Sequence, residues 1–265
     1  MGCQQPSILN FNKVSFCFPS LTKKDQSNNT TVKDALPVMA TAATGGSLWW
    51  RGTKIVCIGR NYLAHVHELH NKVPSEPFWF LKPPSSLIPT GTPHECPPGR
   101  GETHHELELG VIIGKRCRRI EPSVAMEHVA GYCLALDMTD REGQTEAKAA
   151  GKPWTACKGW DTSCPVSAFV PIEAVPDYKK LNLWLKVNDE AEPRQYGCTS
   201  QMIFDVETCI AAISAVHTLE PGDLVLTGTP EGVGPVRPGD VIKAGIAELD
   251  LQLEVPIVAA AADDQ

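Results

Sequence analysis

Three kinds of sequence feature are missing from this chain of 265 residues. No uninterrupted apolar run approaches the ~18 residues that a membrane-spanning helix needs. No cluster of Lys and Arg offsets the acidic excess of 31 Asp and Glu over 24 Lys and Arg, which gives a formal net charge of −7. Neither glycine motif typical of nucleotide-binding loops occurs. We therefore expect no membrane and no nucleic acid among the main partners.

Cysteine occurs ten times but never in a metal-binding arrangement. The chain has no C-x-x-C pair and no Cys–His spacing typical of a zinc finger. The cysteines lie singly, as at Cys57, Cys117, Cys133, Cys157 and Cys209. An isolated Cys usually packs as a small buried hydrophobe. With no secretory signal peptide visible, we expect a reducing, intracellular compartment.

Residues 1–46 differ in composition from the rest. They carry four Lys but no acid before Asp25, and Ser, Thr, Asn and Gln are frequent. Such a stretch buries little apolar surface, so we expect a disordered N-terminal extension. Apolar residues recur at near-helical spacing from Ile8 to Leu21, as in a mitochondrial targeting peptide, although Pro6 and Pro19 interrupt a helix. We expect a mitochondrial protein, with a cytoplasmic location as the alternative.

From residue 47 onward, short apolar runs alternate with Gly and Pro. Runs at 54–59, 107–113, 131–138 and 181–187 have the length of strands, and two Pro-Gly-Asp turns each precede another strand. The best helix is expected over 202–218, where an apolar stripe runs from Ile203 to Val216. Residues 47–258 therefore predict one α+β, mainly β domain, followed by a flexible tail at 259–265.

Carboxylates gather at the ends of two apolar strands. Glu106 and Glu108 alternate with leucines, so they share one face of a strand and repel each other unless a positive charge lies between them. Asp137 ends the apolar strand that begins near 131. Three oxygen anions without a soft ligand suit Mg²⁺ or Mn²⁺. The alternatives are a solvated edge strand for the two Glu, and a cap on the following helix for Asp137.

Two further segments carry ionisable side chains. If the chain is helical from about Tyr62, His65 and Glu68 are neighbours on one face, and a carboxylate bound to an imidazole raises its basicity. The alternative is an exposed helix face with three histidines. Lys158 lies among apolar and small residues and needs an anionic partner, either in a structural ion pair or on a substrate. The glycine-rich loop at 227–234 offers backbone N–H groups and a Thr hydroxyl to a small anion.

Together these segments resemble the fumarylacetoacetate hydrolase family over residues 50–257, and in detail its short acylpyruvase and oxaloacetate decarboxylase branch, which is mitochondrial in animals. The resemblance is carried by five segments in order: Gly59-Arg60-Asn61-Tyr62 with His65 and Glu68, His105-Glu106-Leu107-Glu108, Leu136-Asp137-Met138-Thr139, Lys158, and Thr227-Gly228-Thr229-Pro230-Glu231-Gly232-Val233-Gly234. It implies the family's mixed β-roll with short peripheral helices and a homodimer.

The resemblance also implies a role for each candidate residue. The ligands of Mg²⁺ or Mn²⁺ are Glu106, Glu108 and Asp137. The catalytic residues are His65, Glu68 and Lys158, with His65 and Glu68 activating water on a segment that orders over the site as a lid. The residues that contact a small 2-keto acid substrate are Arg60, Arg141, Gln144 and Thr229.

The implied chemistry passes through an enolate. A 2-keto acid chelates an octahedral cation through adjacent carboxylate and keto oxygens, and breaking a bond to C3 leaves the enolate of pyruvate. We expect cleavage of 3-acylpyruvates to pyruvate and a carboxylic acid, and decarboxylation of oxaloacetate. The alternative is an isomerase, either an oxaloacetate keto–enol tautomerase or a hydroxy-dienoate isomerase. A metal-binding protein without catalysis is disfavoured, because His65, Glu68 and Lys158 would have no task.

Overall fold

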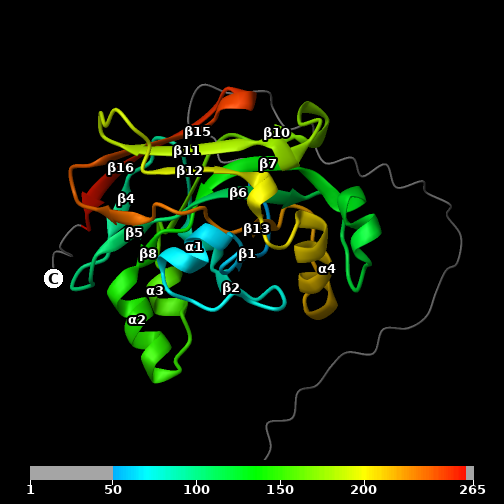
Figure 1. The fold of residues 1–265 in the computed structure, drawn as a ribbon, viewed down its shortest axis with the longest axis horizontal. Helices are drawn as coiled ribbons and strands as arrows, with labels where there is room; N and C mark the ends of the chain where they lie inside the picture. Colours follow the sequence, from blue (N-terminus) through cyan, green and yellow to red (C-terminus); the bar gives the residue numbers. More distant parts are fainter. Residues whose placement is uncertain (1–49, 261–265) are drawn as a thin grey trace, which may run out of the picture. The chain divides into compact units, whose positions relative to one another are not determined.

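The apolar runs of the sequence form the central strands of an eight-stranded sheet. In the computed structural model, which describes residues 50–260, the order is β2-β1-β13-β6-β7-β9-β3, with β10 beside β7 (Figure 1). The strands of this sheet are β1 (Ile55–Ile58), β2 (Trp79–Lys82), β3 (Leu87–Pro89), β6 (Leu107–Ile113), β7 (Val129–Leu136), β9 (Cys164–Val166), β10 (Val170–Pro171) and β13 (Leu224–Leu226). The pairs β1–β13 and β3–β9 are parallel and the other pairs are antiparallel, so the sheet is mixed.

Two smaller sheets complete the β structure. A five-stranded sheet has the order β12-β11-β15-β16-β4, and a three-stranded sheet the order β14-β5-β8. Their strands are β4 (His94–Cys96), β5 (Thr103–His105), β8 (Thr139–Asp140), β11 (Asn182–Val187), β12 (Gln195–Cys198), β14 (Gly234–Val236), β15 (Val241–Ile246) and β16 (Leu251–Ala259). The predicted mainly β fold with a mixed sheet is confirmed.

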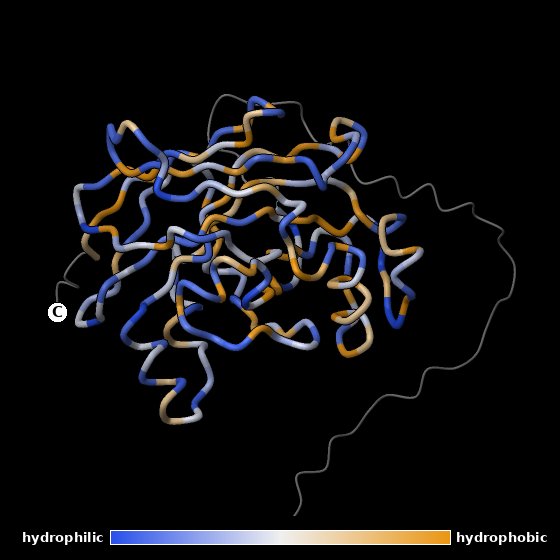
Figure 2. The backbone as a smooth tube through the Cα atoms, viewed as in Figure 1, coloured by the Kyte–Doolittle hydropathy of each residue, from blue (hydrophilic) through white to orange (hydrophobic). Residues whose placement is uncertain are grey.

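The main core lies between the two larger sheets. Alternate residues of β6 and β7, such as Leu109, Val111 and Leu134, pack with Leu185 of β11 and Leu253 of β16. The intervening residues of β6 and β7 face a second core on the other side of the eight-stranded sheet. Figure 2 shows these strands as hydrophobic segments through the middle of the structure. Because β6 is buried on both faces, its polar Glu108 is exceptional.

The helices are short and lie around the sheets (Figure 1). They are α1 (Leu63–Glu68), α2 (Arg141–Ala150), α3 (Thr155–Lys158) and α4 (Val206–Val216). Short 3₁₀ turns occupy Pro84–Ser86, Pro122–His128, Ile172–Ala174, Tyr178–Lys180, Thr199–Gln201 and Ala247–Leu249. Within residues 50–260, no helix combines the length and apolarity needed to cross a membrane. All five cysteines that we singled out are buried.

The predicted helix and the predicted tail have different bounds in the structure. The helix expected over 202–218 is α4, which begins at Val206 because the Asp205 side chain accepts a hydrogen bond from Thr208 N and fixes the N-terminus there. Residues 202–205 bend before it and are not helical, and Ile203 N donates to Asn61 O instead. At the C-terminus, β16 continues to Ala259, the first residue of the expected tail. The extension at 1–46 lies outside the described residues.

Candidate active site

The strand order brings four chain segments to one edge of the eight-stranded sheet. Strand β6 is antiparallel to both β7 and β13, so its first residues meet the last residues of those two strands. Strand β1 is parallel to β13, so β1 ends at the same edge. Glu106 therefore precedes β6 where Asp137 follows β7, and Asp137 N donates to Glu106 O at 2.9 Å. The glycine-rich loop follows β13 at this edge, and α1 follows β1.

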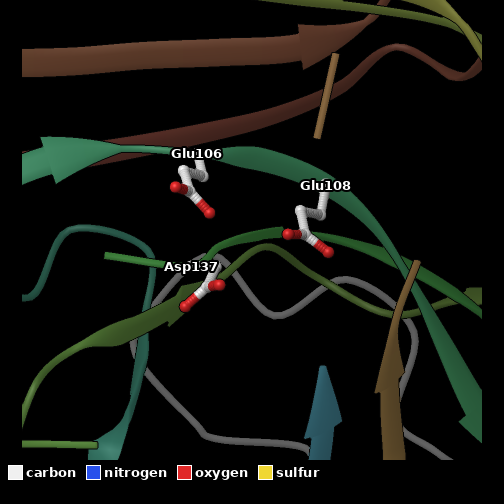
Figure 3. A group of neighbouring side chains, drawn as sticks. All are labelled: Glu106, Glu108 and Asp137. Carbon is white, nitrogen blue, oxygen red and sulfur yellow. The ribbon is translucent and has the colours of Figure 1, made fainter. Parts of the chain in front are cut away.

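Three carboxylates converge there, from Glu106, Glu108 and Asp137, here called the carboxylate triad. Their ligand oxygens lie within 4.8 Å of one another, and each residue is buried, with 6%, 1% and 1% of its surface exposed (Figure 3). Both alternatives for these carboxylates are wrong. Strand β6 lies between β13 and β7 inside the sheet, so it is not a solvated edge strand. The residue that caps α2 is Asp140, whose side chain accepts a hydrogen bond from Gly143 N.

Two of the three carboxylates are paired with cations. Lys158 Nζ lies 2.8 Å from Glu106 Oε2 and 2.5 Å from Asp137 Oδ2, and Arg141 Nη2 lies 2.5 Å from Glu106 Oε1. Burial alone would raise the pKa of Glu106, but the charges of Lys158 and Arg141 hold it well below its usual value. Burial likewise opposes the charge on Lys158, yet Asp137 and Glu106 raise its pKa to about 12.

Lys82 is a buried cation of this site that we did not predict from the sequence. Its Nζ lies 2.9 Å from Asp137 Oδ1 and 3.1 Å from the Met138 carbonyl oxygen, and the residue is 1% exposed. It also donates to the Lys158 carbonyl oxygen, so it holds the segment that carries Lys158 against the end of β7. The local sequence gives no signal for this, because its partners lie 55 or more positions along the chain.

Glu108 differs from its two neighbours because no cation of the described residues forms an ion pair with it. Its Oε2 accepts one hydrogen bond, 2.6 Å long, from Gly228 N. Burial raises its pKa well above the usual value, and the negative charges of Asp137 and Glu106 add to the effect. A divalent cation among the three carboxylates would relieve this repulsion. The donor set is made of hard oxygens, so it fits Mg²⁺ or Mn²⁺.

Gly228 has a backbone conformation that places its N–H against the Glu108 carboxylate. Its φ is +93°, and an added Cβ would lie 2.6 Å from Cβ of Asn61. Only Gly can therefore hold the backbone N–H in this position without moving the loop. The loop does offer N–H groups to an anion, as expected, and one such anion is a carboxylate of the protein itself.

His65 and Glu68 form a hydrogen-bonded pair on α1. His65 Nδ1 lies 3.1 Å from Glu68 Oε2, while Glu68 Oε1 accepts from Gly232 N at 3.0 Å. Although burial raises the pKa of Glu68, its hydrogen bonds to His65 and Gly232 N lower it overall. A carboxylate only accepts, so Nδ1 carries the proton and Nε2 of the imidazole is left as a base. The alternative of three equivalent exposed histidines is wrong: His65 is 5% exposed, whereas His67 and His70 are exposed.

Nine of the ten candidate residues line one pocket. Its lining includes His65, Lys158, Arg60, Arg141, Gln144, Thr229 and the carboxylate triad. The tenth, Glu68, lies behind His65 and contacts it directly. Gln144 Oε1 accepts from Arg141 Nη1 at 2.7 Å, so these two side chains fix each other.

Gln195 is a second buried residue that sequence reasoning missed. Its Oε1 accepts from Leu107 N at 3.0 Å and from His105 Nδ1 at 2.9 Å, and its Nε2 donates to Thr229 Oγ1 at 2.8 Å and to the Pro230 carbonyl oxygen at 3.0 Å. Since Thr229 Oγ1 accepts this bond, the Thr229 hydroxyl proton remains free to donate to a ligand. Gln195 thus joins the start of β6 to the glycine-rich loop.

The chain is similar to known proteins over most of its length. A sequence model described as fumarylacetoacetate (FAA) hydrolase C-terminal matches residues 54–255. A relative from Dictyostelium discoideum named mitochondrial oxaloacetate decarboxylase is 52% identical over 211 residues, which cover 79% of this chain and 96% of the relative. A relative from Homo sapiens named mitochondrial oxaloacetate tautomerase FAHD1 is 52% identical over 208 residues, which cover 78% of this chain and 93% of the relative.

A solved structure agrees with these sequence matches. The crystal structure of fumarylpyruvate hydrolase from Pseudomonas aeruginosa, in complex with Mn²⁺ and pyruvate, has a TM-score of 0.74 and 36% sequence identity to this chain. The similarity covers 79% of this chain and 91% of that one. The family match over residues 54–255 and the identity to these relatives establish that this chain belongs to the fumarylacetoacetate hydrolase family.

Proposed function

We propose that this chain is a Mg²⁺- or Mn²⁺-dependent enzyme that forms the enolate of pyruvate from 2-keto acids. It cleaves 3-acylpyruvates to pyruvate and a carboxylic acid, and it decarboxylates oxaloacetate. The observation that carries the proposal is the buried carboxylate triad, within 4.8 Å, in the same pocket as His65. The names of the two relatives and the Mn²⁺ and pyruvate of the fumarylpyruvate hydrolase structure support it.

The residues of the pocket have different chemical roles. A divalent cation held by the triad would supply a Lewis acid for the keto group and for the developing enolate charge. Lys158 adds a fixed positive charge at the same place, and the free hydroxyl proton of Thr229 offers a hydrogen bond to the same anion. Arg141 and Gln144 hold each other in place at the pocket wall, which limits how the substrate can turn.

His65 acts as the general base in this proposal. With Nδ1 bonded to Glu68, Nε2 takes a proton from water, and the resulting hydroxide attacks the distal carbonyl of an acylpyruvate. The bond between C3 and that carbonyl carbon then breaks, and its electron pair passes into the enolate of pyruvate. Oxaloacetate needs no attacking water, since loss of CO₂ leaves the same enolate.

An oxaloacetate keto–enol tautomerase is the second candidate, and the name of the Homo sapiens relative favours it. Proton transfer at C3 needs one group that removes a proton and another that returns it. His65 and Lys158 both line the pocket and both can carry a proton. A hydroxy-dienoate isomerase would use the same two groups on a longer substrate.

The experiment that tests the proposal is a substrate panel with controlled metal. Several 3-acylpyruvates and the keto and enol forms of oxaloacetate are assayed with Mg²⁺ or Mn²⁺, after exhaustive chelation with EDTA, and after metal is restored. We expect turnover that is lost on chelation and regained with either ion. Full activity in the chelated protein would contradict metal dependence, and tautomerisation faster than hydrolysis and decarboxylation would make the second candidate primary.

We also propose that the protein is a mitochondrial homodimer. The mitochondrial location is supported by the names of both relatives and by the composition of residues 1–46. The homodimer is supported by family membership. A fluorescent fusion of the full chain, compared with one that lacks residues 1–46, tests the first statement. Light scattering on the eluted protein tests the second, and a monomeric mass would contradict it.

A further inference from the structure

The cations that line the active-site pocket are of two kinds. Arg141 and Lys158 are paired with the carboxylate triad, as described above. Arg60 and Lys148 also line the pocket, but no carboxylate within residues 50–260 forms an ion pair with either of them. A positive charge that no carboxylate of the protein neutralises remains available to an anionic ligand.

Arg60 and Lys148 are held over aromatic rings. Three aromatic residues, Phe80, Trp154 and Phe78, contact one another in that order with ring centroids 5.5 and 6.2 Å apart, and we call them the aromatic wall. Lys148 Nζ lies 5.3 Å from the Trp154 ring, and Arg60 Cζ lies 5.5 Å from the Phe78 ring. An aromatic face positions a cation without cancelling its charge.

At the other end of the aromatic wall, Phe80 contacts Lys158, a cation that is paired with the carboxylate triad. Lys158 Nζ lies 5.1 Å from the Phe80 ring while it binds Glu106 and Asp137. The wall therefore runs from the metal end of the pocket, at Phe80, to the two unpaired cations at Trp154 and Phe78. A ligand with anions at both ends would match this arrangement.

The local backbone keeps Arg60 in place. Its φ is +56°, a conformation that residues other than Gly, Asn and Asp seldom adopt. The preceding residue is Gly59, and a Cβ added there would lie 2.4 Å from the Phe78 ring. The turn after β1 thus allows Phe78 to pack closely and directs the next side chain over that ring. Backbone strain of this kind concentrates at functional sites.

We propose that Arg60 and Lys148 bind a second carboxylate of the substrate, so that the site selects dicarboxylic 2-keto acids over those with a neutral tail. This inference rests on the proposed function and names its substrate class. The charges within the pocket agree with it. Lys158, Lys82 and Arg141 pair with two of the triad carboxylates, Glu106 and Asp137, whereas Arg60 and Lys148 form no ion pair with a carboxylate of residues 50–260. Arg60 and Arg141 lie close enough to Lys148 for their charges, after burial, to lower its pKa.

The test compares two acylpyruvates that share a head group and differ in the tail. Fumarylpyruvate carries a second carboxylate, whereas acetylpyruvate ends in a methyl group. Lys148→Met and Arg60→Gln are compared with Lys148→Arg, which keeps the charge, and with Lys152→Met, which removes a charge from an exposed Lys outside the pocket lining. The quantity measured is the ratio of kcat/KM for fumarylpyruvate to that for acetylpyruvate.

We expect Lys148→Met and Arg60→Gln each to lower this ratio by about tenfold to a hundredfold, mainly through KM for fumarylpyruvate. Lys148→Arg should keep most of the preference and Lys152→Met all of it. Melting temperatures and spectra of the four variants identify any that fail to fold. A ratio in folded Lys148→Met equal to that of the wild type would overturn the inference.

A binding measurement separates this inference from the proposed function. Calorimetry in the presence of Mn²⁺ compares pyruvate with 2-oxoglutarate, which adds a second carboxylate to the same head group. We expect the wild type to bind 2-oxoglutarate more tightly and Lys148→Met to lose that difference. If the wild type turns over no acylpyruvate and no oxaloacetate, yet shows this difference, the proposed function fails and the anion site stands. If it turns them over and shows no difference, only the anion site fails.

Discussion

Replacing Gln195 by Leu tests how the site is held together. The carboxamide is fully buried, and its orientation is fixed by its partners, because Leu107 N–H can only donate and the Pro230 carbonyl can only accept. Leu fills a similar volume without any polar atom. The substitution leaves two backbone groups unpaired and removes the acceptor of His105 Nδ1. It also removes the donor that fixes the Thr229 hydroxyl.

The cost follows from the number of groups left without partners. A buried donor or acceptor without a partner costs about 1–3 kcal/mol, so the two unpaired backbone groups together lower the free energy of unfolding by roughly 2–6 kcal/mol. For a domain of this size each kcal/mol shifts the melting temperature by about 2–4 °C. We therefore expect Gln195→Leu to melt about 4–24 °C below the wild type.

Thermal unfolding followed by circular dichroism measures this change. Gln252→Leu is the matched control, because Gln252 lies exposed on β16 and its substitution should change stability by no more than about 0.5 kcal/mol. At temperatures where the Gln195→Leu variant is folded, kcat/KM should also fall, since Thr229 loses its orientation. A melting temperature within 2 °C of the control, with activity retained, would refute the role assigned to Gln195.

Three further predictions concern stability, catalysis and the N-terminal extension. Burial raises the pKa of Asp223, but hydrogen bonds from Glu220 N, Thr53 and Lys54 lower it overall. The ionised Asp223 therefore stabilises the fold above about pH 4, and this stabilisation is lost as the pH falls through the folded-state pKa. Asp223→Asn should therefore flatten the acid side of the melting temperature–pH curve, and an unchanged curve would contradict this. His65→Ala should slow acylpyruvate hydrolysis by about 10²–10⁴-fold and oxaloacetate decarboxylation by less, whereas equal losses would argue against water activation. Removal of residues 1–46 should keep kcat within a small factor, because none of the candidate residues lies there, and a large loss with an intact fold would show that the extension contributes to the site.

The parts of the site that could be predicted from the sequence have a local signal. Glu108 interrupts an apolar strand, and Asp137 ends one, so each stands out against its neighbours. Their meeting at one sheet edge follows from the antiparallel pairing of β6 with β7. His65 and Glu68 are three positions apart, and a single helical turn is enough to bring them together.

The parts that could not be predicted depend on contacts between distant segments. Lys82 follows three apolar residues at the end of β2, and nothing nearby shows that it reaches Asp137. Gln195 follows a polar turn, and its partners at Leu107 and Thr229 lie 88 and 34 positions away. The start of α4 was placed too early because the apolar periodicity includes Ile203, whereas the cap at Asp205 decides the boundary.

The most direct test of a metal at the carboxylate triad is a Mn²⁺ titration of Glu108→Gln. Glu106 is a poorer choice, because its removal leaves Lys158 and Arg141 with one anionic partner fewer. Within residues 50–260, Glu108 has only Gly228 N as a hydrogen-bond partner, and an amide oxygen can also accept that bond. The metal-free variant should therefore melt at or above the wild-type temperature. We predict that calorimetry shows one Mn²⁺ site in the wild type and an affinity at least a hundredfold weaker in Glu108→Gln. Stoichiometric binding by the variant with wild-type affinity would contradict the account.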